Sequence, residues 1–338
     1  MENKNNPMEI SEASSLSRPQ ISVCVIAYNH AKYILECLEG IRKQVGAPTF
    51  EVIIRDDAST DDTAALICSY IEKNQLSNFI YHRAEKNGGM MKNVTAALGL
   101  CRGDFVALCE GDDYWTDPAK LQKQHALMTA HPGCTISAHA SYIDAGTGRA
   151  RRAFQRGDAV TRFELRDILV SSSTQFAPTA SYMIRNEIVA DLPDWFEGAP
   201  IGDFFLELLS LKKGYGLYLP DVMSAYRVLA TGSWSSGMKN DRRRSIEYGQ
   251  RMLKLITILE DDPQLKANGL DILKANVKAL LASDFLLCGE FKKFRDCIEE
   301  SFSLNRCWQS RTATYLYRLR RFPSMASFIY RAKRAYLE

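Results

Sequence analysis

Short apolar runs alternate with amphipathic stretches along the first third of the chain. The apolar runs are Ile21–Ala27, Phe50–Arg55, Phe79–His82 and Asp104–Cys109. Continuous apolar runs of this length are typical of strands buried on both faces of a parallel sheet. Stretches with helical spacing follow the first three runs, at Tyr33–Gln44, after Asp57 and at Asn93–Cys101. The pattern therefore predicts a right-handed, doubly wound α/β sheet.

Further along, the alternation becomes irregular and then gives way to helix alone. We expect a helix at Trp115–His131, a strand at Cys134–Tyr142 and a loop at 146–157. A strand at Thr179–Arg185, a helix at Gly202–Leu211 and a last strand near Tyr226 are expected to follow. From Asn240 onward the spacing is helical, with apolar stripes at Ile246–Leu259 and Leu270–Cys288. The predicted organisation is a disordered leader at 1–18, an α/β domain at 19–238 and a helical C-terminal region at 239–338.

Composition fits a globular protein with a sizeable core, since 46% of the 338 residues are hydrophobic and 25% are charged. Nine cysteines are present without a paired CxxC spacing, so we interpret them as small buried residues rather than zinc ligands. Residues 1–20 lack the apolar core of a signal peptide, and no apolar run approaches a membrane span. These features together predict a cytoplasmic protein.

Charge is concentrated at the C-terminal end, although the whole chain carries only +3. From Arg306 onward, eight Lys or Arg stand against one acidic residue, Glu338, which gives this tail about +7. Aromatic residues such as Trp308 and Phe328 are interleaved with the basic ones. This combination suits an anionic membrane surface, and a basic face toward solvent or a partner subunit is the alternative. Nucleic acid is not an expected partner, because the basic cluster is confined to the end of an α/β chain.

Two acidic clusters follow predicted buried strands. Asp56 and Asp57 come after the second strand, and the acidic turn Glu110–Asp113 comes after the fourth. In a doubly wound sheet both face the crevice at the carboxyl ends of the strands. Clustered carboxylates require compensation by a cation or by hydrogen-bond donors, and Mg²⁺ or Mn²⁺ commonly binds one or two carboxylates plus substrate phosphates. Either cluster alone could be ordinary turn chemistry, with Ser59 or Thr60 as the cap of the following helix.

Ordered motifs across residues 20–236 resemble the family 2 glycosyltransferases of the GT-A fold. The motifs are Val25-Ile-Ala-Tyr-Asn-His, Arg55-Asp-Asp-Ala-Ser-Thr-Asp, Asn87-Gly-Gly, Glu110-Gly-Asp-Asp-Tyr-Trp, Ile201-Gly-Asp-Phe-Phe-Leu, Met223-Ser-Ala-Tyr-Arg and Ser233-Trp-Ser. The resemblance implies inverting transfer of a sugar, with UDP as the expected nucleotide, to a glycan or lipid-linked acceptor in cell-surface polysaccharide (capsule, exopolysaccharide or O-antigen) synthesis. It also implies a GT-A sheet with a C-terminal helical extension and a requirement for Mn²⁺ or Mg²⁺.

The resemblance also implies a role for individual residues. The base of the donor would lie against Ala27, Tyr28, Asp56 and Asp57, and Lys92 would lie near the pyrophosphate. Glu110, Gly111 and Asp112 would hold the ribose and the metal-bridged diphosphate. The metal ligands implied are Glu110, Asp112 and Asp113. Asp203 is the implied catalytic base. Arg227 and Trp234 lie in the stretch that is implied to close over donor and acceptor.

Three features depart from the family pattern. Leu229 stands where many members have a histidine that supports the metal or diphosphate, and all five histidines precede residue 140. Lys92 replaces a more usual arginine, and Glu110 is one methylene longer than aspartate. We therefore predict that a metal binds weakly to the protein alone and clearly together with nucleotide. His30 is interpreted as a polar loop residue near the base pocket.

Asp203 follows Gly202 at a predicted helix start, where backbone donors are expected to keep its carboxylate ionised and able to accept a proton. An ordinary helix start is the alternative interpretation of this residue. Two other functions compete with the transferase. A catalytically silent nucleotide-sugar-binding or scaffolding protein is favoured by Leu229 and Lys92. A nucleotidyltransferase would need a glycine-rich loop after the first strand, and residues 28–31 supply none.

Overall fold

The computed structural model describes residues 18–146, 148, 150–171, 176–228, 241–306 and 310–337. The chain forms two compact units. The first consists of Met1–Thr161, Ala177–Leu192 and Leu217–Arg227, and the second of Arg162–Phe176, Pro193–Gly216 and Val228–Glu338. The second unit thus takes in two segments of the predicted α/β region together with the helical C-terminal residues.

A mixed sheet of ten described strands organises the first unit, which confirms the predicted α/β class. Its strands are β1 Ile21–Ala27, β2 Phe50–Asp56, β3 Phe79–Arg83, β4 Phe105–Glu110, β5 Tyr114–Trp115, β6 Cys134–Asp144, β7 Arg151–Ala153, β8 Thr161–Phe163, β9 Met183–Arg185 and β10 Tyr215–Arg227. Eight follow the order β3-β2-β1-β4-β9-β6-β10-β5, and β7 pairs with β6. β1 lies between β2 and β4 and is parallel to both, whereas β9 runs antiparallel to β4.

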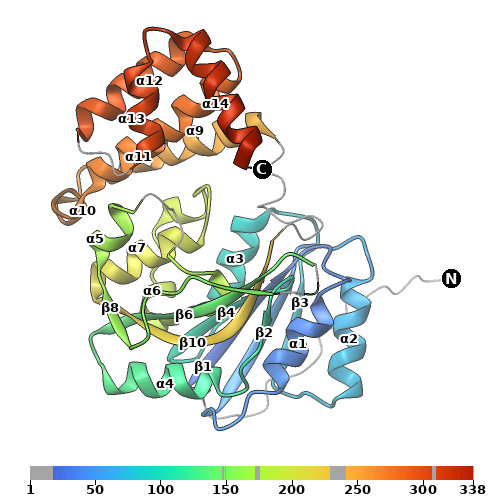
Figure 1. Cartoon of the computed structure of the whole chain (residues 1–338). Coiled ribbons are helices and arrows are strands. Elements are labelled where there is room, and N and C mark those ends of the chain that lie inside the picture. The colour runs from blue at the N-terminus through green and yellow to red at the C-terminus, as the bar shows by residue number, and fades with distance from the viewer. Residues whose placement is uncertain are drawn as a thin grey trace. The chain divides into compact units, whose positions relative to one another are not determined.

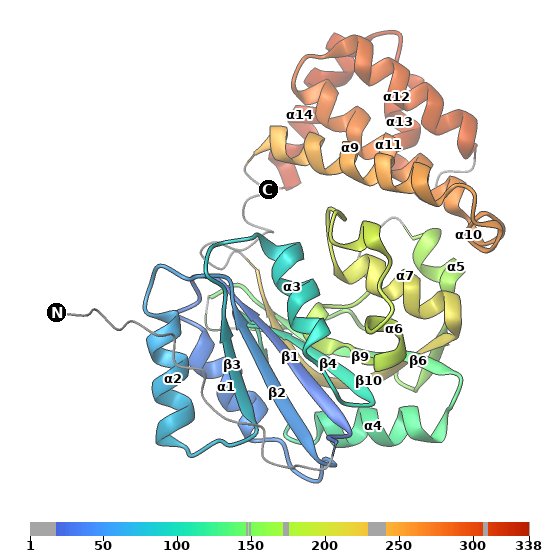
Figure 2. The same cartoon turned by 180° about the vertical axis from the view of Figure 1, so that it is seen from behind.

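Helices cover both faces of the parallel part of the sheet. They are α1 Ile34–Arg42, α2 Thr63–Lys73, α3 Met90–Gly99, α4 Lys120–Ala130 and α6 Asn186–Val189. Helices α1 and α2 lie on one face and α3 lies on the other (Figures 1 and 2). In α1 the buried residues Ile34, Cys37, Leu38 and Ile41 recur at helical spacing, which is why this segment forms a helix with one face on the sheet.

Several elements begin or end away from the predicted positions. The helix predicted from Trp115 begins at Lys120, because Tyr114 and Trp115 pair with β10 and Pro118 precludes helix in the residue before it. The strand predicted at Thr179–Arg185 begins with a 3-10 turn, Thr179–Ser181, before β9. The predicted loop 146–157 contains the short strand β7.

The second unit is helical. Its helices are α5 Leu165–Leu169, α7 Asp203–Lys213, α9 Arg242–Leu259, α10 Pro263–Asn268, α11 Leu270–Leu287, α12 Phe291–Leu304, α13 Arg311–Arg318 and α14 Pro323–Leu337, with a 3-10 turn at Asp194–Phe196. Helix α11 is the central one, and it packs against α9, α12, α13 and α14. The apolar positions of α11 that predicted a helix, among them Leu273, Val277 and Leu281, are buried in these contacts.

Candidate active site

Both acidic clusters begin at the same level of the sheet, on either side of β1. In the strand register Ala27 is paired with Asp56, and Ile26 is paired with Glu110. Two backbone hydrogen bonds extend this alignment past the strand ends: the Asp57 N–H donates to the Ala27 carbonyl at 2.9 Å, and the Gly111 N–H donates to the Ile26 carbonyl at 2.8 Å. The sheet therefore brings the two clusters to one edge, as the sequence predicted.

Asp56 is completely buried, and the fold itself satisfies its carboxylate. Oδ1 accepts hydrogen bonds from the backbone N–H and the hydroxyl of Ser59, and Oδ2 accepts one from the Tyr81 hydroxyl at 2.9 Å. The Arg83 guanidinium adds an ion pair at 3.7 Å. Ser59 thus braces the turn after β2 and does not cap α2, whose N-cap is Asp62. Asp56 is placed to hold this turn rather than to meet a ligand, so the predicted contact with a base is not what its surroundings favour.

Asp57 is also buried, and it joins the turn after β2 to the start of α3. Its two carboxylate oxygens accept hydrogen bonds from the Gly88 N–H at 2.8 Å and the Gly89 N–H at 2.9 Å. Gly89 has φ +88°, a conformation that side-chain-bearing residues rarely adopt, and it is the N-cap of α3. An anion at a helix N-terminus is favoured by the unpaired N–H groups there. Lys92, in the first turn of α3, is exposed beside this junction.

The loop after β1 is cross-linked to the loop after β2. Asn29, at φ +56°, donates its N–H to the Ser59 hydroxyl at 2.9 Å, and its side-chain oxygen accepts the Thr60 N–H at 2.8 Å. Ala27 is buried, whereas Tyr28, predicted to face a base, is 41% exposed. An aromatic ring held outward by a braced loop is available to lie against a planar ligand.

The acidic turn is compact because a glycine lies at its second position. A side chain at Gly111 would meet His30 Nδ1 at 2.8 Å and the Ile26 carbonyl at 3.1 Å, so only glycine fits without displacement. Asp113 is 1% exposed, and its Oδ1 accepts the Arg227 N–H at 2.8 Å. Its Oδ2 is buried and has no hydrogen-bond partner among the described residues. Burial, together with the nearby Asp112 and Glu110 charges, raises the pKa of Asp113 well above its usual range.

Arg227 locks the acidic turn from β10. Besides the backbone contact to Asp113, its Nη1 donates to the Asp112 carbonyl at 2.7 Å. The guanidinium lies 4.3 Å from the centroid of the Tyr114 ring and 5.1 Å from that of the Tyr33 ring, and it forms ion pairs with Glu36 and, at 3.7 Å, with Asp144. This side chain is largely buried. It therefore supports the acidic turn, and the predicted closure of Arg227 over the substrates stays a prediction.

His30, in the loop after β1, packs against the acidic turn. The sequence interpretation missed this contact. The ring lies against Gly111, with Nδ1 buried and lacking a hydrogen-bond partner and Nε2 4.0 Å from Asp112 Oδ1. Burial lowers its pKa, although the carboxylates of Asp112 and Asp61 act in the opposite direction. Gly111 was the only hint of this contact that the sequence interpretation could have used. A glycine in a turn indicates that another group packs closely there, but not which group.

Asp203 lies in the second unit, as the first residue of α7 after the N-cap Gly202. Oδ1 accepts the Phe204 N–H at 2.7 Å. Burial raises the pKa of Asp203 to about 6, and the backbone hydrogen bonds only partly offset that effect. Desolvation at this buried helix start thus outweighs the backbone donors, although a pKa of about 6 still leaves the carboxylate mostly ionised at neutral pH, as the sequence predicted.

The oxygen ligands of the acidic turn suit Mg²⁺ or Mn²⁺ in kind but are too few to hold one alone. In the described part of the chain, no group of three or more His, Cys, Asp or Glu is placed to bind a metal ion. One oxygen of Asp113 already accepts a hydrogen bond from the Arg227 N–H, and Glu110 and Asp112 are the other two carboxylates of the turn. Such a pair fits a metal that takes its other ligands from substrate phosphates. Leu229 and Trp234 lie outside the described residues.

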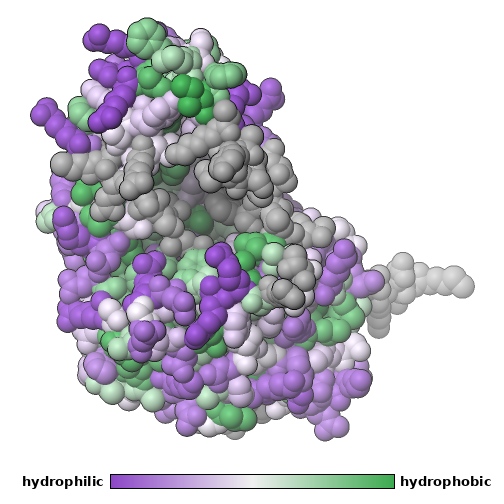
Figure 3. Space-filling model, in the orientation of Figure 1, coloured by the Kyte–Doolittle hydropathy of each residue, from purple (hydrophilic) through white to green (hydrophobic). Residues whose placement is uncertain are grey.

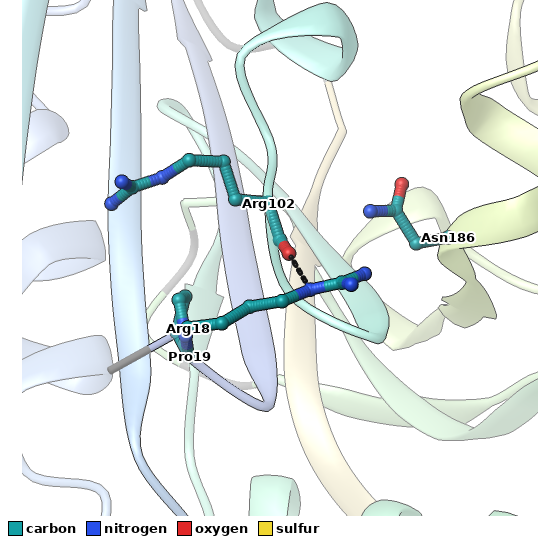
Figure 4. A pocket seen from close by; sticks show the side chains of 4 residues that line it. All are labelled: Arg18, Pro19, Arg102 and Asn186. Atoms are coloured by element: carbon teal, nitrogen blue, oxygen red, sulfur yellow. Dashed lines mark hydrogen bonds between the residues drawn. The ribbon is translucent and has the colours of Figure 1, made fainter. Parts of the chain in front are cut away.

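A separate cavity of about 430 Å³ lies at the opposite end of the strands (Figure 4). Its lining residues are Arg18, Pro19, Arg102 and Asn186. Both arginines are neutralised: Arg102 by Glu51 at 2.6 Å and Arg18 by Asp104 at 3.2 Å. Because the amino ends of β1 and β4 border it, this cavity is remote from the acidic clusters.

Comparison with known sequences gives the same picture as the geometry. The family model for glycosyl transferase family 2 matches residues 22–192, half of the chain. An uncharacterized protein of Mycobacterium tuberculosis is 34% identical over 230 residues, which are 66% of this chain and 63% of that protein. The poly(ribitol-phosphate) β-N-acetylglucosaminyltransferase TarS of Staphylococcus aureus is 38% identical over 163 residues, 48% of this chain and 28% of TarS. The match thus spans less than two thirds of either relative.

Solved structures show the same fold. Residues 1–349 of TarS, crystallised with UDP-GlcNAc, match with a TM-score of 0.65 at 20% identity, covering 91% of this chain and 89% of that one. The mannosyltransferase PcManGT from Pyrobaculum calidifontis, in complex with GDP-Man and Mn²⁺, matches with a TM-score of 0.54 at 14% identity, covering 93% and 87%. The fold is thus that of GT-A glycosyltransferases, and the chain belongs to glycosyl transferase family 2.

Proposed function

We propose that this chain is an inverting glycosyltransferase that moves a sugar from a nucleoside diphosphate, UDP by preference, to a hydroxyl of a glycan or lipid-linked acceptor. Cell-surface polysaccharide synthesis is the proposed setting, in line with TarS among its relatives. TarS and PcManGT have been crystallised with nucleotide sugars, which supports a donor of this class. The eight cysteines described are free thiols, which suits a reducing cytoplasm.

The donor is proposed to bind at the edge where β1, β2 and β4 end. Tyr28 offers an exposed ring for the base, and Asp57 fixes the junction with α3 along which the base and ribose would lie. Lys92, exposed in the first turn of α3, would stand near the diphosphate. The acidic turn supplies Glu110 and Asp112 toward the ribose and diphosphate. A divalent ion held by these carboxylates and the diphosphate would neutralise charge on the leaving group.

Asp203 is proposed as the base. In the reaction the acceptor oxygen forms a bond to the sugar C1 while the bond between C1 and the β-phosphate oxygen breaks, which inverts the anomeric centre. The acceptor proton passes to the Asp203 carboxylate, and the electron pair of the broken bond leaves on the diphosphate. A pKa of about 6 leaves Asp203 mostly ionised at neutral pH, yet makes it a stronger proton acceptor than an exposed aspartate.

The construction of the acidic turn is the observation that carries this proposal. The turn has the features of a site built for charge compensation: a glycine in close contact with His30 and the Ile26 carbonyl, an arginine that fixes the turn, and a buried carboxylate oxygen without a partner among the described residues. A thermal-shift screen of nucleoside diphosphates and nucleotide sugars, with and without Mn²⁺, tests it. We expect one nucleotide to stabilise the protein, and more so with the metal.

Donor hydrolysis separates the transferase from a catalytically silent binding protein. The transferase should consume its nucleotide sugar slowly in water and faster with acceptor, whereas a silent protein would show the thermal shift without turnover. Absence of a shift with every nucleotide would count against both functions.

A further inference from the structure

The C-terminal helix α14 carries an apolar stripe on its outer face. We use the name apolar stripe for Phe322, Met325, Phe328 and Ile329, whose exposed fractions are 63%, 46%, 76% and 39%. Phe322 directly precedes α14, and the other three residues lie within it. Spacings of three, three and one residue place the four side chains on one side of the helix. Hydrophobic side chains gather over α14 on the face seen in Figure 3, with hydrophilic ones beside them. Four large apolar side chains exposed together mark an interaction surface rather than scattered surface residues.

The opposite face of α14 already holds the helix in place. Ala326 and Ser327 are buried, and the Ser327 hydroxyl donates to the Leu286 carbonyl at 3.4 Å. Arg331 donates to the Leu287 carbonyl at 2.5 Å and to the Ser327 hydroxyl at 3.4 Å. Since polar and small residues make the internal contacts with α11, the apolar stripe is not needed to dock α14 on its own unit.

The charge around the apolar stripe identifies its occupant. Residues from Arg306 onward carry about +7, and Arg321 is exposed directly before Phe322 at the start of the stripe. Two copies of so basic a surface would repel each other, which disfavours pairing of α14 with α14. An anionic lipid surface offers both partners at once: acyl chains for the stripe and negative headgroups for the arginines. In the described residues no helix is both long and apolar enough to cross a bilayer, so α14 would lie along the surface.

We infer that α14, with Phe322 directly before it, is an interfacial membrane-docking helix, which inserts Phe322, Met325, Phe328 and Ile329 among the lipids while Arg321 contacts anionic headgroups. The sequence suggested a basic aromatic tail; the structure selects the side chains that enter the membrane. Tyr315 and Leu316 of α13 are not among the side chains that enter the membrane, because Tyr315 is half-buried and Leu316 is buried. The inference does not depend on which sugar or acceptor the enzyme uses.

Vesicle sedimentation with the full chain tests the inference. We expect binding to vesicles of phosphatidylcholine mixed with phosphatidylglycerol, weakened by salt, and little binding to phosphatidylcholine alone. The double substitution Met325→Gln and Phe328→Gln should lower the partition coefficient about tenfold or more, since each buried apolar side chain contributes strongly to transfer from water. The control pair Ile258→Gln and Leu280→Gln removes equally exposed apolar residues from α9 and α11 and should leave binding unchanged.

Three results would overturn the inference. The unchanged protein might stay in the supernatant with anionic vesicles, or the control pair might weaken binding as much as the stripe pair. Alternatively, sedimentation equilibrium without lipid might show a dimer that Met325→Gln and Phe328→Gln dissociate, which would assign the stripe to a second copy of the chain. Unchanged melting temperatures of the two double variants ensure that lost binding reflects the surface and not the fold.

Discussion

The two acidic clusters stand side by side at the sheet edge, yet the fold treats them differently. The carboxylates of Asp56 and Asp57 receive hydrogen bonds from Ser59, Tyr81 and the glycines before α3. In the acidic turn, by contrast, Asp113 Oδ2 is buried without a partner, and burial beside two other carboxylates raises the pKa of Asp113. The first cluster is thus completed within the protein, whereas the second still requires positive charge or donors.

This difference distinguishes carboxylates that stabilise the fold from carboxylates that take part in binding or catalysis. A carboxylate that the fold satisfies stabilises the protein, and its loss should act on stability. A carboxylate held in an unfavourable environment is the kind found at functional sites. Asp203 belongs with the second kind, because burial raises its pKa to about 6. The predictions below test this division, in order of expected effect.

Asp203→Asn should have the largest effect on activity. Loss of a general base typically slows a reaction about 10²–10⁴-fold. Asn keeps an oxygen for the Phe204 N–H but cannot take the acceptor proton, so sugar transfer should fall by this factor while nucleotide binding persists. Glu197→Gln, an exposed change in the same unit, is the control. Equal turnover of Asp203→Asn and the unchanged protein would remove Asp203 from the mechanism.

The same variant should be more stable at neutral pH. A folded-state pKa of about 6, against an ordinary 3.8, means that the folded protein binds this proton more tightly than the unfolded chain does. Stability is therefore lost as pH rises from about 4 to 6, and Asp203→Asn should recover up to about 3 kcal/mol at pH 7 and almost none at pH 4. Transfer by the unchanged enzyme should fall as pH drops below about 6. Denaturation curves and rates across this range measure both effects.

Asp112→Asn should slow transfer about 10²–10³-fold, since it removes charge where the leaving diphosphate is stabilised. It should also weaken the metal-dependent part of nucleotide binding while leaving the melting temperature nearly unchanged. Asp62→Asn, an exposed change at the N-cap of α2, is the control. A fall in stability comparable to the fall in activity would place Asp112 with the scaffold.

Asp56→Ala should act on stability instead. It leaves the Tyr81 hydroxyl and Ser59 N–H without their acceptor, which we expect to cost about 2–4 kcal/mol of unfolding free energy. Asp62→Ala, at a helix cap without a side-chain cap hydrogen bond, should cost much less. Denaturant unfolding of the two variants makes the comparison. If Asp56→Ala remains as stable as Asp62→Ala while losing donor binding, Asp56 contacts the ligand.

Arg227→Lys should have the smallest effect. Lysine keeps the charge but cannot repeat the forked contacts to the Asp112 carbonyl and Glu36 together with the stack on Tyr114. We expect transfer to fall about tenfold, with KM for the donor rising, because the acidic turn loses its support. A rate loss as large as that of Asp112→Asn would show that Arg227 contacts the diphosphate directly.

Apolar patterning was enough to predict the parallel core. The run at Ile21–Ala27 became β1 with the same bounds, and the run at Phe50–Arg55 became β2, which is one residue longer, because helices bury both faces of these strands. Where other forces decide, the pattern was misleading. Trp115 reads as the start of a helix, but pairing with Ser224 and the proline at 118 make it a strand residue. Such long-range pairing leaves no local periodicity to detect.

The site was predictable in its carboxylates but not in their surroundings. Motif order brought Asp57, Glu110 and Asp112 to one edge, as register then confirmed. The part played by His30 depends on which side chain approaches Gly111, and that approach comes from the packing of separate segments. The raised pKa of Asp203 likewise follows from burial, which a helix-start pattern does not report.

The most direct test of the central claim is a calorimetric titration of Mn²⁺ into the protein with and without UDP. Glu110 and Asp112 are too few ligands to hold a divalent ion by themselves, so we predict weak binding to the protein alone and clear binding once UDP supplies phosphate oxygens. Asp112→Asn should abolish the gain that UDP brings. Tight Mn²⁺ binding without nucleotide, or binding that UDP does not improve, would contradict the claim that metal and donor bind together.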